Sequence, residues 1–386
     1  MKELFSSVLS VLKECLADHP KEISLHEPSF AGNEWHYVKE CLDSGWVSSV
    51  GKFVDRFEKD LAEYTGAQRA IAVVNGTAAL HVCLKLVGVE SKDEVLIPAL
   101  TFVAPANAVS YLNAIPHFID SEEKTLGIDP SKLAVYLKDM TKIQDGECRN
   151  KMTGRRIKAL IPMHTFGHPV DMDPVLELCS RYKLELVEDC AESLGSLYKG
   201  HHTGTMGRVS AFSFNGNKIC TTGGGGAILT NDEKLGTLAK HITTTARSVH
   251  QWEISHDMIG YNYRLPNINA ALGVAQLEQL PEFVSKKRML AERYRRGFKN
   301  TKGLRFFVEP EFARSNYWLN ALLLDTKNAG ERDNLLEKTN SNGIMTRPAW
   351  KPMHLLPMFK NCPRMDLSVT EDLAARIINI PSSSFL

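Results

Sequence analysis

The sequence lacks several features that mark particular classes of protein. No two of its eight cysteines have the C-x-x-C spacing of a zinc or redox site, so we expect reduced and mostly buried thiols. No apolar run is long enough to cross a bilayer, and there is no fixed-period repeat or low-complexity tract. The 46 Lys and Arg residues nearly cancel the 45 Asp and Glu residues, which gives no whole-chain electrostatic case for binding nucleic acid or an anionic membrane. We therefore expect an ordinary globular protein of the cytoplasm.

The length of the chain predicts more than one domain. A chain of 386 residues exceeds the size at which a single core usually stops growing. We expect residues 1–24 to form an N-terminal arm with a short amphipathic helix. Charged side chains interrupt the apolar residues of this segment, whereas a signal peptide has an uninterrupted apolar stretch. We expect a large domain over residues 25–262 and a smaller C-terminal α+β domain over residues 263–386.

From about Arg69, short β-rich runs alternate with longer helical runs. Strands are expected at Arg69–Val74, Glu94–Leu100, Ile115–Ile119, Ile157–Met163, Leu184–Val187, Val209–Phe214 and Ala227–Thr230. Helices are expected at Ala78–Val89, Val103–Leu112, Ser131–Lys138, Pro174–Tyr182 and Asp232–His241. This alternation predicts an α/β domain with a mostly parallel sheet that is covered on both faces.

Two further segments carry specific expectations. The polar stretch 141–156 predicts a surface insertion. A helix over Asn267–Gln279 is expected to end before Pro281, after which a second helical stretch runs to about Arg296.

Polar residues follow several of the predicted strands, where ligands bind in parallel α/β sheets. Asn75-Gly76-Thr77 follows the first strand and opens a helix, so that its small residues leave backbone N–H groups free to face an anion. Taken alone, a plain helix cap by Thr77 explains this motif better. Asp189 follows the strand Leu184–Val187 and either caps a turn or faces a cationic ring nitrogen.

A lysine stands at the end of a further strand. Lys218 closes the segment Ser213-Phe-Asn-Gly-Asn-Lys218 and precedes the four glycines 223–226, where the chain can approach a bulky ligand closely. The G-x-x-x-x-G-K-[ST] order is absent, which excludes a nucleoside triphosphatase of that type. Taken together, a phosphate cradle, an aromatic residue, a strand-end Asp and a lysine before glycines are what a pyridoxal 5'-phosphate (PLP) site needs.

Four segments carry a resemblance to a known family. They are Asn75-Gly-Thr-Ala-Ala-Leu80, Glu188-Asp-Cys-Ala-Glu-Ser193, Phe212-Ser-Phe-Asn-Gly-Asn-Lys218 and Gly260-Tyr-Asn-Tyr-Arg264. The chain resembles the DegT/StrS family of PLP-dependent nucleotide-sugar aminotransferases over nearly its whole length. Two N-terminal runs, Leu25–Glu34 and Asp43–Gly51, are similar to the branch that serves legionaminic-acid-type sugar pathways. The resemblance implies fold type I, the aspartate aminotransferase-like fold.

The resemblance also implies roles for individual residues. Lys218 would carry the cofactor as a covalent aldimine and then move a proton between cofactor and substrate, while Asp189 would hold the pyridinium nitrogen protonated. Phe102 would stack on the ring, and His164 would pack near the ring or the substrate, although a buried structural histidine is an alternative for that position. The phosphate would be held by three residues of the same chain and by one of a neighbouring subunit. These are Gly76, Thr77 and Ser213, with Asn262 from the partner of a homodimer.

The implied reaction is transfer of an amino group from L-glutamate to a nucleotide-linked keto sugar. The expected acceptor is a UDP-linked 4-keto-6-deoxy-N-acetylhexosamine, giving a 4-amino sugar for a surface glycan. Glu192, which replaces the Gln or His often found in its motif, is a candidate substrate contact together with Trp318 and His354. No metal is expected. The alternatives are a PLP-dependent sugar dehydratase, an aminotransferase acting on a free keto sugar, and a nonenzymatic binding or regulatory protein, although the presence of Lys218 and Asp189 favours transamination.

Overall fold

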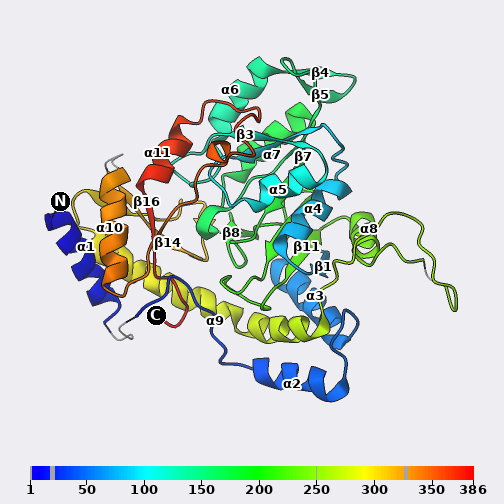
Figure 1. Ribbon diagram of the computed structural model, residues 1–386, viewed down its shortest axis with the longest axis horizontal. Helices are drawn as coiled ribbons and strands as arrows, with labels where there is room; N and C mark the ends of the chain where they lie inside the picture. Colours follow the sequence, from blue (N-terminus) through cyan, green and yellow to red (C-terminus); the bar gives the residue numbers. More distant parts are fainter. Residues whose placement is uncertain (1, 18–21, 249, 326–328) are drawn as a thin grey trace.

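The computed structural model describes residues 2–17, 22–248, 250–325 and 329–386 (Figure 1). Its main sheet has seven strands in the order β1-β11-β10-β7-β6-β2-β3. Their bounds are β1 Arg69–Val73, β2 Glu94–Pro98, β3 Ile115–Ile119, β6 Ile157–Leu160, β7 Glu185–Asp189, β10 Val209–Ser213 and β11 Gly226–Thr230. Every neighbouring pair is parallel except the two that involve β11. The predicted, mostly parallel sheet is confirmed.

Helices cover both faces of this sheet, because successive side chains of each strand point to opposite sides. On β10, Phe212 packs with Phe57 and Leu61 of α3 (Lys52–Thr65), whereas Ala211 packs with α4 (Gly76–Leu86) on the other face. The second face also carries α5 (Ala104–Tyr111) and α8 (Glu233–Thr243), while α6 (Pro130–Met140) and α7 (Met172–Tyr182) extend the layer of α3. Burial on both faces explains the continuous apolar runs of the strands.

The expected break before Pro281 is wrong, because a single helix, α9, runs from Asn267 to Phe298. A proline inside a helix costs about 3 kcal/mol. Leu277, Leu280 and Val284 are buried on either side of it, and each buried side chain of this kind contributes roughly 1.5–3 kcal/mol. Packing of the apolar face therefore outweighs the local penalty. In Figure 1, α9 lies along the molecule, with α2 (Glu34–Ser44) beside it.

A smaller antiparallel sheet follows α9. Its order is β12-β14-β16-β15, with bounds Leu304–Phe306, Asn320–Leu324, Ile377–Ile380 and Arg347–Pro348 respectively. It packs with α10 (Ala329–Ser341), α11 (Ser368–Arg376) and the amphipathic N-terminal helix α1 (Lys2–Cys15). Ile23 pairs with Ile344, so the N-terminal arm adds to this C-terminal unit. We place the proposed domain boundary at residues 262/263, just before α9.

The polar stretch 141–156 forms a hairpin of β4 (Thr141–Gln144) and β5 (Glu147–Asn150). It is more than a surface insertion, because Asn150 and Thr153 donate hydrogen bonds of 2.9 and 2.7 Å to the buried carboxylate of Glu94. A short strand, β8 (Leu197–Tyr198), pairs with β9 (His201–His202) on one side and with β13 (Ala313–Arg314) on the other. Two 3-10 turns complete the fold, η1 (Thr165–Gly167) and η2 (Met353–Leu355). Within the described ranges, none of the helices is long and apolar enough to span a bilayer.

Candidate active site

A cavity of about 290 Å³ lies where β1, β7 and β10 end, which is the edge at which parallel sheets bind ligands. Most of the residues expected from the sequence line it. They are Gly76, Thr77, Phe102, Asp189, Glu192, Ser213, Lys218 and Trp318. The strands bring these residues together from positions more than two hundred residues apart in the chain.

The N-terminus of α4 forms one end of the cavity. Asn75, and not Thr77, caps the helix, since its side chain accepts a hydrogen bond of 2.8 Å from the N–H of Ala78. The first N–H groups of a helix have no intrahelical partner, so those of Gly76 and Thr77 are available to an anion. A Cβ on Gly76 would lie 2.9 Å from Cβ of Ser213, so glycine is what allows the Ser213 hydroxyl to approach this helix end.

The glycines after Lys218 serve chain packing more than ligand approach. A Cβ on Gly226 would lie 2.4 Å from the backbone of Asn75, closer than real Cβ atoms come. Of the four glycines, Gly225 lines the cavity. The run therefore lets β11 pass the loop that leads into α4, which keeps the helix end beside the cavity.

Asp189 places a buried carboxylate on the cavity wall. It ends β7, and one of its oxygens accepts a 3.0 Å hydrogen bond from the N–H of Ala191. Burial raises the pKa of Asp189, while that hydrogen bond and the nearby Lys218 and His164 oppose the rise. A carboxylate of this kind is stabilised by a cation brought into the cavity, such as a protonated ring nitrogen.

Lys218 follows β10 and reaches into the same cavity. Its Nζ lies 3.8 Å from the ring centroid of Trp318 and 3.4 Å from Oε1 of Glu192. The indole N–H of Trp318 donates a 2.8 Å hydrogen bond to the carbonyl of Asn217, which fixes the ring beneath the lysine. Trp318 is thus both core and cavity wall. Nζ thus has one aromatic and one carboxylate neighbour, and the side chain lines the cavity.

The residues present fit PLP. The cavity offers an anion-binding helix end, a buried carboxylate for a ring N–H, and a primary amine for the aldehyde carbon. Phe102 is half exposed although it is a large apolar side chain, so that a ring can stack on it.

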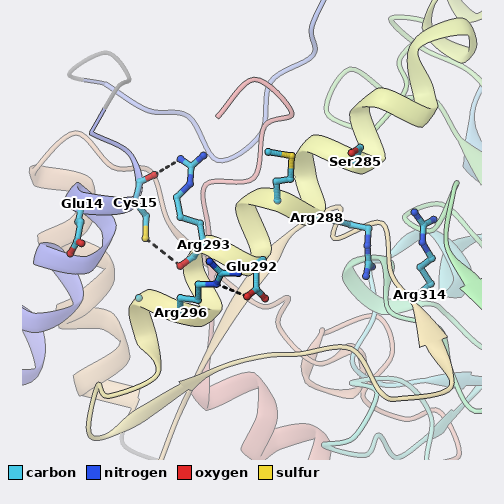
Figure 2. A pocket seen from close by; sticks show the side chains of 10 residues that line it. Glu14, Cys15, Ser285, Arg288, Glu292, Arg293, Arg296 and Arg314 are labelled. Atoms are coloured by element: carbon cyan, nitrogen blue, oxygen red, sulfur yellow. Dashed lines mark hydrogen bonds and ion pairs between the residues drawn. The ribbon is translucent and has the colours of Figure 1, made fainter.

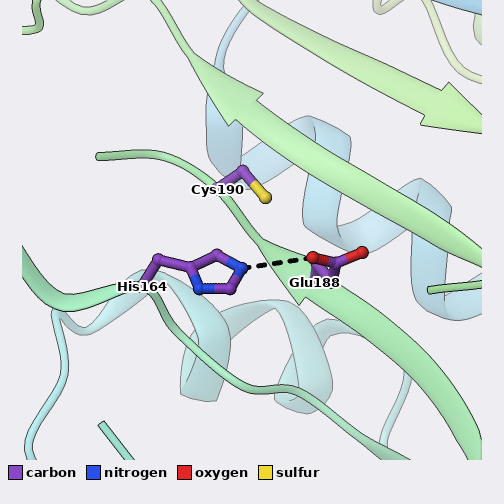
Figure 3. Close-up of side chains that lie close together, drawn as sticks. All are labelled: His164, Glu188 and Cys190. Atoms are coloured by element: carbon purple, nitrogen blue, oxygen red, sulfur yellow. Dashed lines mark hydrogen bonds and ion pairs between the residues drawn. The ribbon is translucent and has the colours of Figure 1, made fainter. Parts of the chain in front are cut away.

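His164 is not among the residues that line this cavity, and its ring points toward Glu188 (Figure 3). Its Nε2–H donates to Oε2 of Glu188 at 3.2 Å, and its Nδ1 accepts from the N–H of Val170. The buried-histidine alternative describes its contacts.

Glu188, His164 and Cys190 lie close enough together to suggest a metal site. Both oxygens of Glu188 are already used, because they accept three backbone N–H groups as well as His164. Burial raises the pKa of Glu188, but the hydrogen bonds and the neighbouring His164 outweigh burial, so that the pKa is lowered overall. Burial holds the pKa of the Cys190 thiol well above its usual value. The cluster is a hydrogen-bonded core that offers no free carboxylate ligand.

Two expected residues lie away from the cavity of their own chain. Asn262 is exposed, and its backbone pairs with that of Thr244. His354 is not among the residues that line the cavity, and its role as a substrate contact stays a prediction. Its imidazole is buried, and Nε2 lies 2.8 Å from Oε1 of Glu371 in α11, which holds the side chain elsewhere.

Sequence reasoning missed several residues of the wall. Trp350 follows β15 and packs 5.0 Å from the ring of Phe166, and Met163, Asn215 and Asn217 also line the cavity. Asn215 and Asn217 stand within the quoted Lys218 motif, so their position was the available signal. Trp350 comes from the C-terminal sheet, and no local pattern indicates its place.

A larger groove of about 870 Å³ lies between α1 and the second half of α9 (Figure 2). Four of its ten lining residues are arginines, and three of these have side-chain partners: Arg288 pairs with Glu309, Arg296 pairs with Glu292, and Arg293 donates to the carbonyl of Cys15. Its described lining includes Glu14, Cys15 and Ser285 but no lysine, so the groove lacks the pairing of an amine with a buried carboxylate that the smaller cavity has, and its size does not make it the active site.

Comparison with known proteins agrees with this geometry. The model of the DegT/DnrJ/EryC1/StrS aminotransferase family matches residues 28–386. The chain is 40% identical over 362 residues to a GDP-perosamine synthase of Escherichia coli O157:H7, covering 94% of this chain and 93% of that protein. It is also 40% identical to a putative pyridoxal phosphate-dependent aminotransferase, EpsN, of Bacillus subtilis, covering 94% and 92%.

Among solved structures, the aminotransferase TlmJ of Streptoalloteichus hindustanus superimposes with a TM-score of 0.85 at 30% identity, covering 95% of this chain and 94% of that one. This agreement over almost the full length confirms the fold type I architecture. The chain belongs to the DegT/DnrJ/EryC1/StrS aminotransferase family and is a PLP-dependent sugar aminotransferase.

Proposed function

We propose that the protein moves the amino group of L-glutamate to a nucleotide-linked keto sugar for a surface glycan. The observation that carries this proposal is the convergence of Lys218, Asp189, Phe102 and the α4 N-terminus on one cavity. When bound, PLP supplies an electron sink for the carbon whose C–H bond is broken. The chain supplies the rest. Gly76, Thr77 and Ser213 hold the phosphate, Asp189 keeps the ring nitrogen protonated, and Lys218 binds the cofactor and moves the proton.

Two acceptors have specific support. Relatives named GDP-perosamine synthase, at 35–40% identity, favour a GDP-linked sugar. The second candidate is the UDP-linked 4-keto-6-deoxy-N-acetylhexosamine, which the N-terminal motifs at residues 25–34 and 43–51 favour. We place the GDP-linked keto sugar first, because its support comes from similarity over nearly the whole chain.

An amination assay separates the two acceptors. The holoenzyme is supplied with L-glutamate and each nucleotide-linked 4-keto sugar in turn, and the amino sugar and 2-oxoglutarate are measured by mass spectrometry. We expect stoichiometric formation of both products, with kcat/KM for the GDP-linked sugar at least about 10-fold above that for the UDP-linked sugar, as for a site that recognises the base through polar groups. The reverse ratio would establish the UDP-linked candidate. Amination of a free keto sugar at the same efficiency would contradict the nucleotide-linked substrate.

We further propose that the enzyme is a homodimer whose sites are completed across the interface. Segment 250–259 extends beyond α8 in Figure 1 and exposes Trp252, Ile254 and Ile259, each by 70% or more. Such a gathering of exposed apolar side chains is typical of a surface that another chain covers. Asn262 lies three residues after the end of this segment, which supports its role at the phosphate of the partner's cofactor.

Subunit complementation tests this arrangement. Lys218→Ala and Asn262→Ala are each expected to be impaired, but a dimer with one chain of each kind keeps one intact site. Random co-assembly should therefore restore roughly a quarter of the wild-type activity. Co-expression of Lys218→Ala with Asp189→Asn is the matched control and should restore none, because both changes damage the site of their own chain. A shared site would be contradicted if co-expressed Lys218→Ala and Asn262→Ala showed no more activity than the sum of the activities of the two variants measured separately.

A further inference from the structure

Glu192 faces the nitrogen atom at which the reaction takes place. Its Oε1 lies 3.4 Å from Nζ of Lys218, and its Oε2 accepts a 2.8 Å hydrogen bond from the N–H of Phe166. Phe166 lies in η1 with a positive φ of 55°, and its ring is fully buried, so this anchor is fixed. One carboxylate oxygen is therefore held in place, and the other is directed at the lysine.

The surroundings of Glu192 contain few other charges. Asp189 approaches from the end of β7 and Lys218 from the turn after β10, while Trp318 and Trp350 close the cavity from the C-terminal unit. Burial, as the largest effect, raises the pKa of Glu192 to about 7, with Asp189 adding to the rise and Lys218 and the Phe166 N–H opposing it. Near neutral pH the side chain can thus both take up and return a proton, as a general acid–base group requires.

The proposed reaction creates a need for such a group. An amino donor arrives as an ammonium ion, which has no lone pair with which to attack. Its nitrogen must take the place of the Lys218 nitrogen, and therefore comes within reach of whatever group lies beside Nζ. Glu192 is the carboxylate closest to that position, as its ion pair with Lys218 shows.

We propose that Glu192 is the catalytic residue that removes the proton from the amine that exchanges with Lys218. The proton passes from the ammonium nitrogen to Oε1, the nitrogen keeps the electron pair of its broken N–H bond, and Glu192 becomes a neutral acid. When the exchange is reversed, the proton returns to the amine that leaves. This inference rests on the proposed aminotransferase function and assigns a step within it.

Glu192→Gln tests this step because glutamine keeps the size of the side chain and can still accept from the Phe166 N–H, but cannot accept the proton. The half-reaction with L-glutamate is followed in single turnovers from pH 6 to 9. In the wild type we expect the rate to rise through about pH 7 as the carboxylate ionises, and in the variant we expect that rise to vanish and the rate at pH 7.5 to fall about 10²-fold.

A second measurement uses the cofactor-free protein and does not depend on turnover. Lys218 is acetylated with acetic anhydride at pH 8, and its modification is followed by peptide mass mapping. The carboxylate favours the ammonium form, so Glu192→Gln should be labelled roughly three- to tenfold faster. Glu122→Gln is the matched control, because Glu122 also has a pKa raised by burial but bonds Thr125 away from the cavity, and it should change neither result.

The two measurements separate this inference from the proposed function. A retained rise through pH 7 in Glu192→Gln, or an unchanged labelling rate, overturns the role of Glu192 even if sugars are aminated. Failure of the wild type to react with L-glutamate, together with faster labelling of the variant, overturns the donor assignment and leaves the effect of Glu192 on Lys218 standing.

Discussion

Replacement of Lys218 by alanine is expected to lower the overall rate of amino transfer by at least about 10⁴-fold, because the change removes both the covalent attachment and the proton carrier. The fold should survive. The change leaves Glu192 buried without its cation, but a carboxyl with a pKa of about 7 takes up a proton instead of remaining as an isolated charge. Turnover with both substrates and the melting temperature of the cofactor-free variant check the two parts of this expectation.

Lys286→Ala is the matched control for this change. Lys286 is exposed on α9, where it pairs with Glu282 one turn away, and exposed pairs of this kind contribute little to stability. We expect wild-type activity in that variant. Turnover of Lys218→Ala within tenfold of the wild type would show that another amine carries the cofactor.

Replacement of Asp189 by asparagine is the second change with a large expected effect. Loss of the charge leaves a ring N–H⁺ without its buried partner, and breaking a buried ion pair costs about 3–5 kcal/mol, or roughly 10²- to 10⁴-fold in PLP affinity and rate combined. The volume of the side chain and the hydrogen bond from Ala191 are kept, so folding should be little affected. Cofactor titration by absorbance and steady-state kinetics measure the two contributions.

Asp173→Asn serves as the control for Asp189→Asn. Asp173 lies in the first turn of α7 and is exposed beside Lys199, remote from the cavity. Its variant should bind PLP and turn over as the wild type does. Wild-type kinetics in Asp189→Asn would mean that the ring nitrogen does not need a charged partner, and that the carboxylate serves only the loop after β7.

The parts of the site that could be predicted are those indicated by the sequence pattern immediately around each residue. The strand that ends at Asp189 and the strand before Lys218 are short apolar runs followed at once by polar residues. In a parallel sheet such residues share one edge, so their convergence followed from the pattern of strands. Gly76 and Thr77 were likewise found from a strand followed by a helix start.

What the sequence did not reveal depends on contacts between distant segments. Trp350 reaches the cavity only because the C-terminal sheet packs over it, and His354, a few residues later, is drawn to Glu371 instead. The continuity of α9 through Pro281 depends on burial of its apolar face, which local propensity does not contain. The proximity of Glu192 to the Lys218 amine arises in the same way, from the anchor at Phe166.

The most direct test of the central claim is the visible absorbance spectrum of the purified protein before and after L-glutamate, followed by borohydride reduction and peptide mass mapping. We expect a bound-cofactor band that shifts when L-glutamate is added, and a reduced cofactor adduct on the peptide containing Lys218. Absence of bound cofactor even after PLP is added, or an adduct on a different lysine, would contradict the assignment of this cavity as the catalytic site.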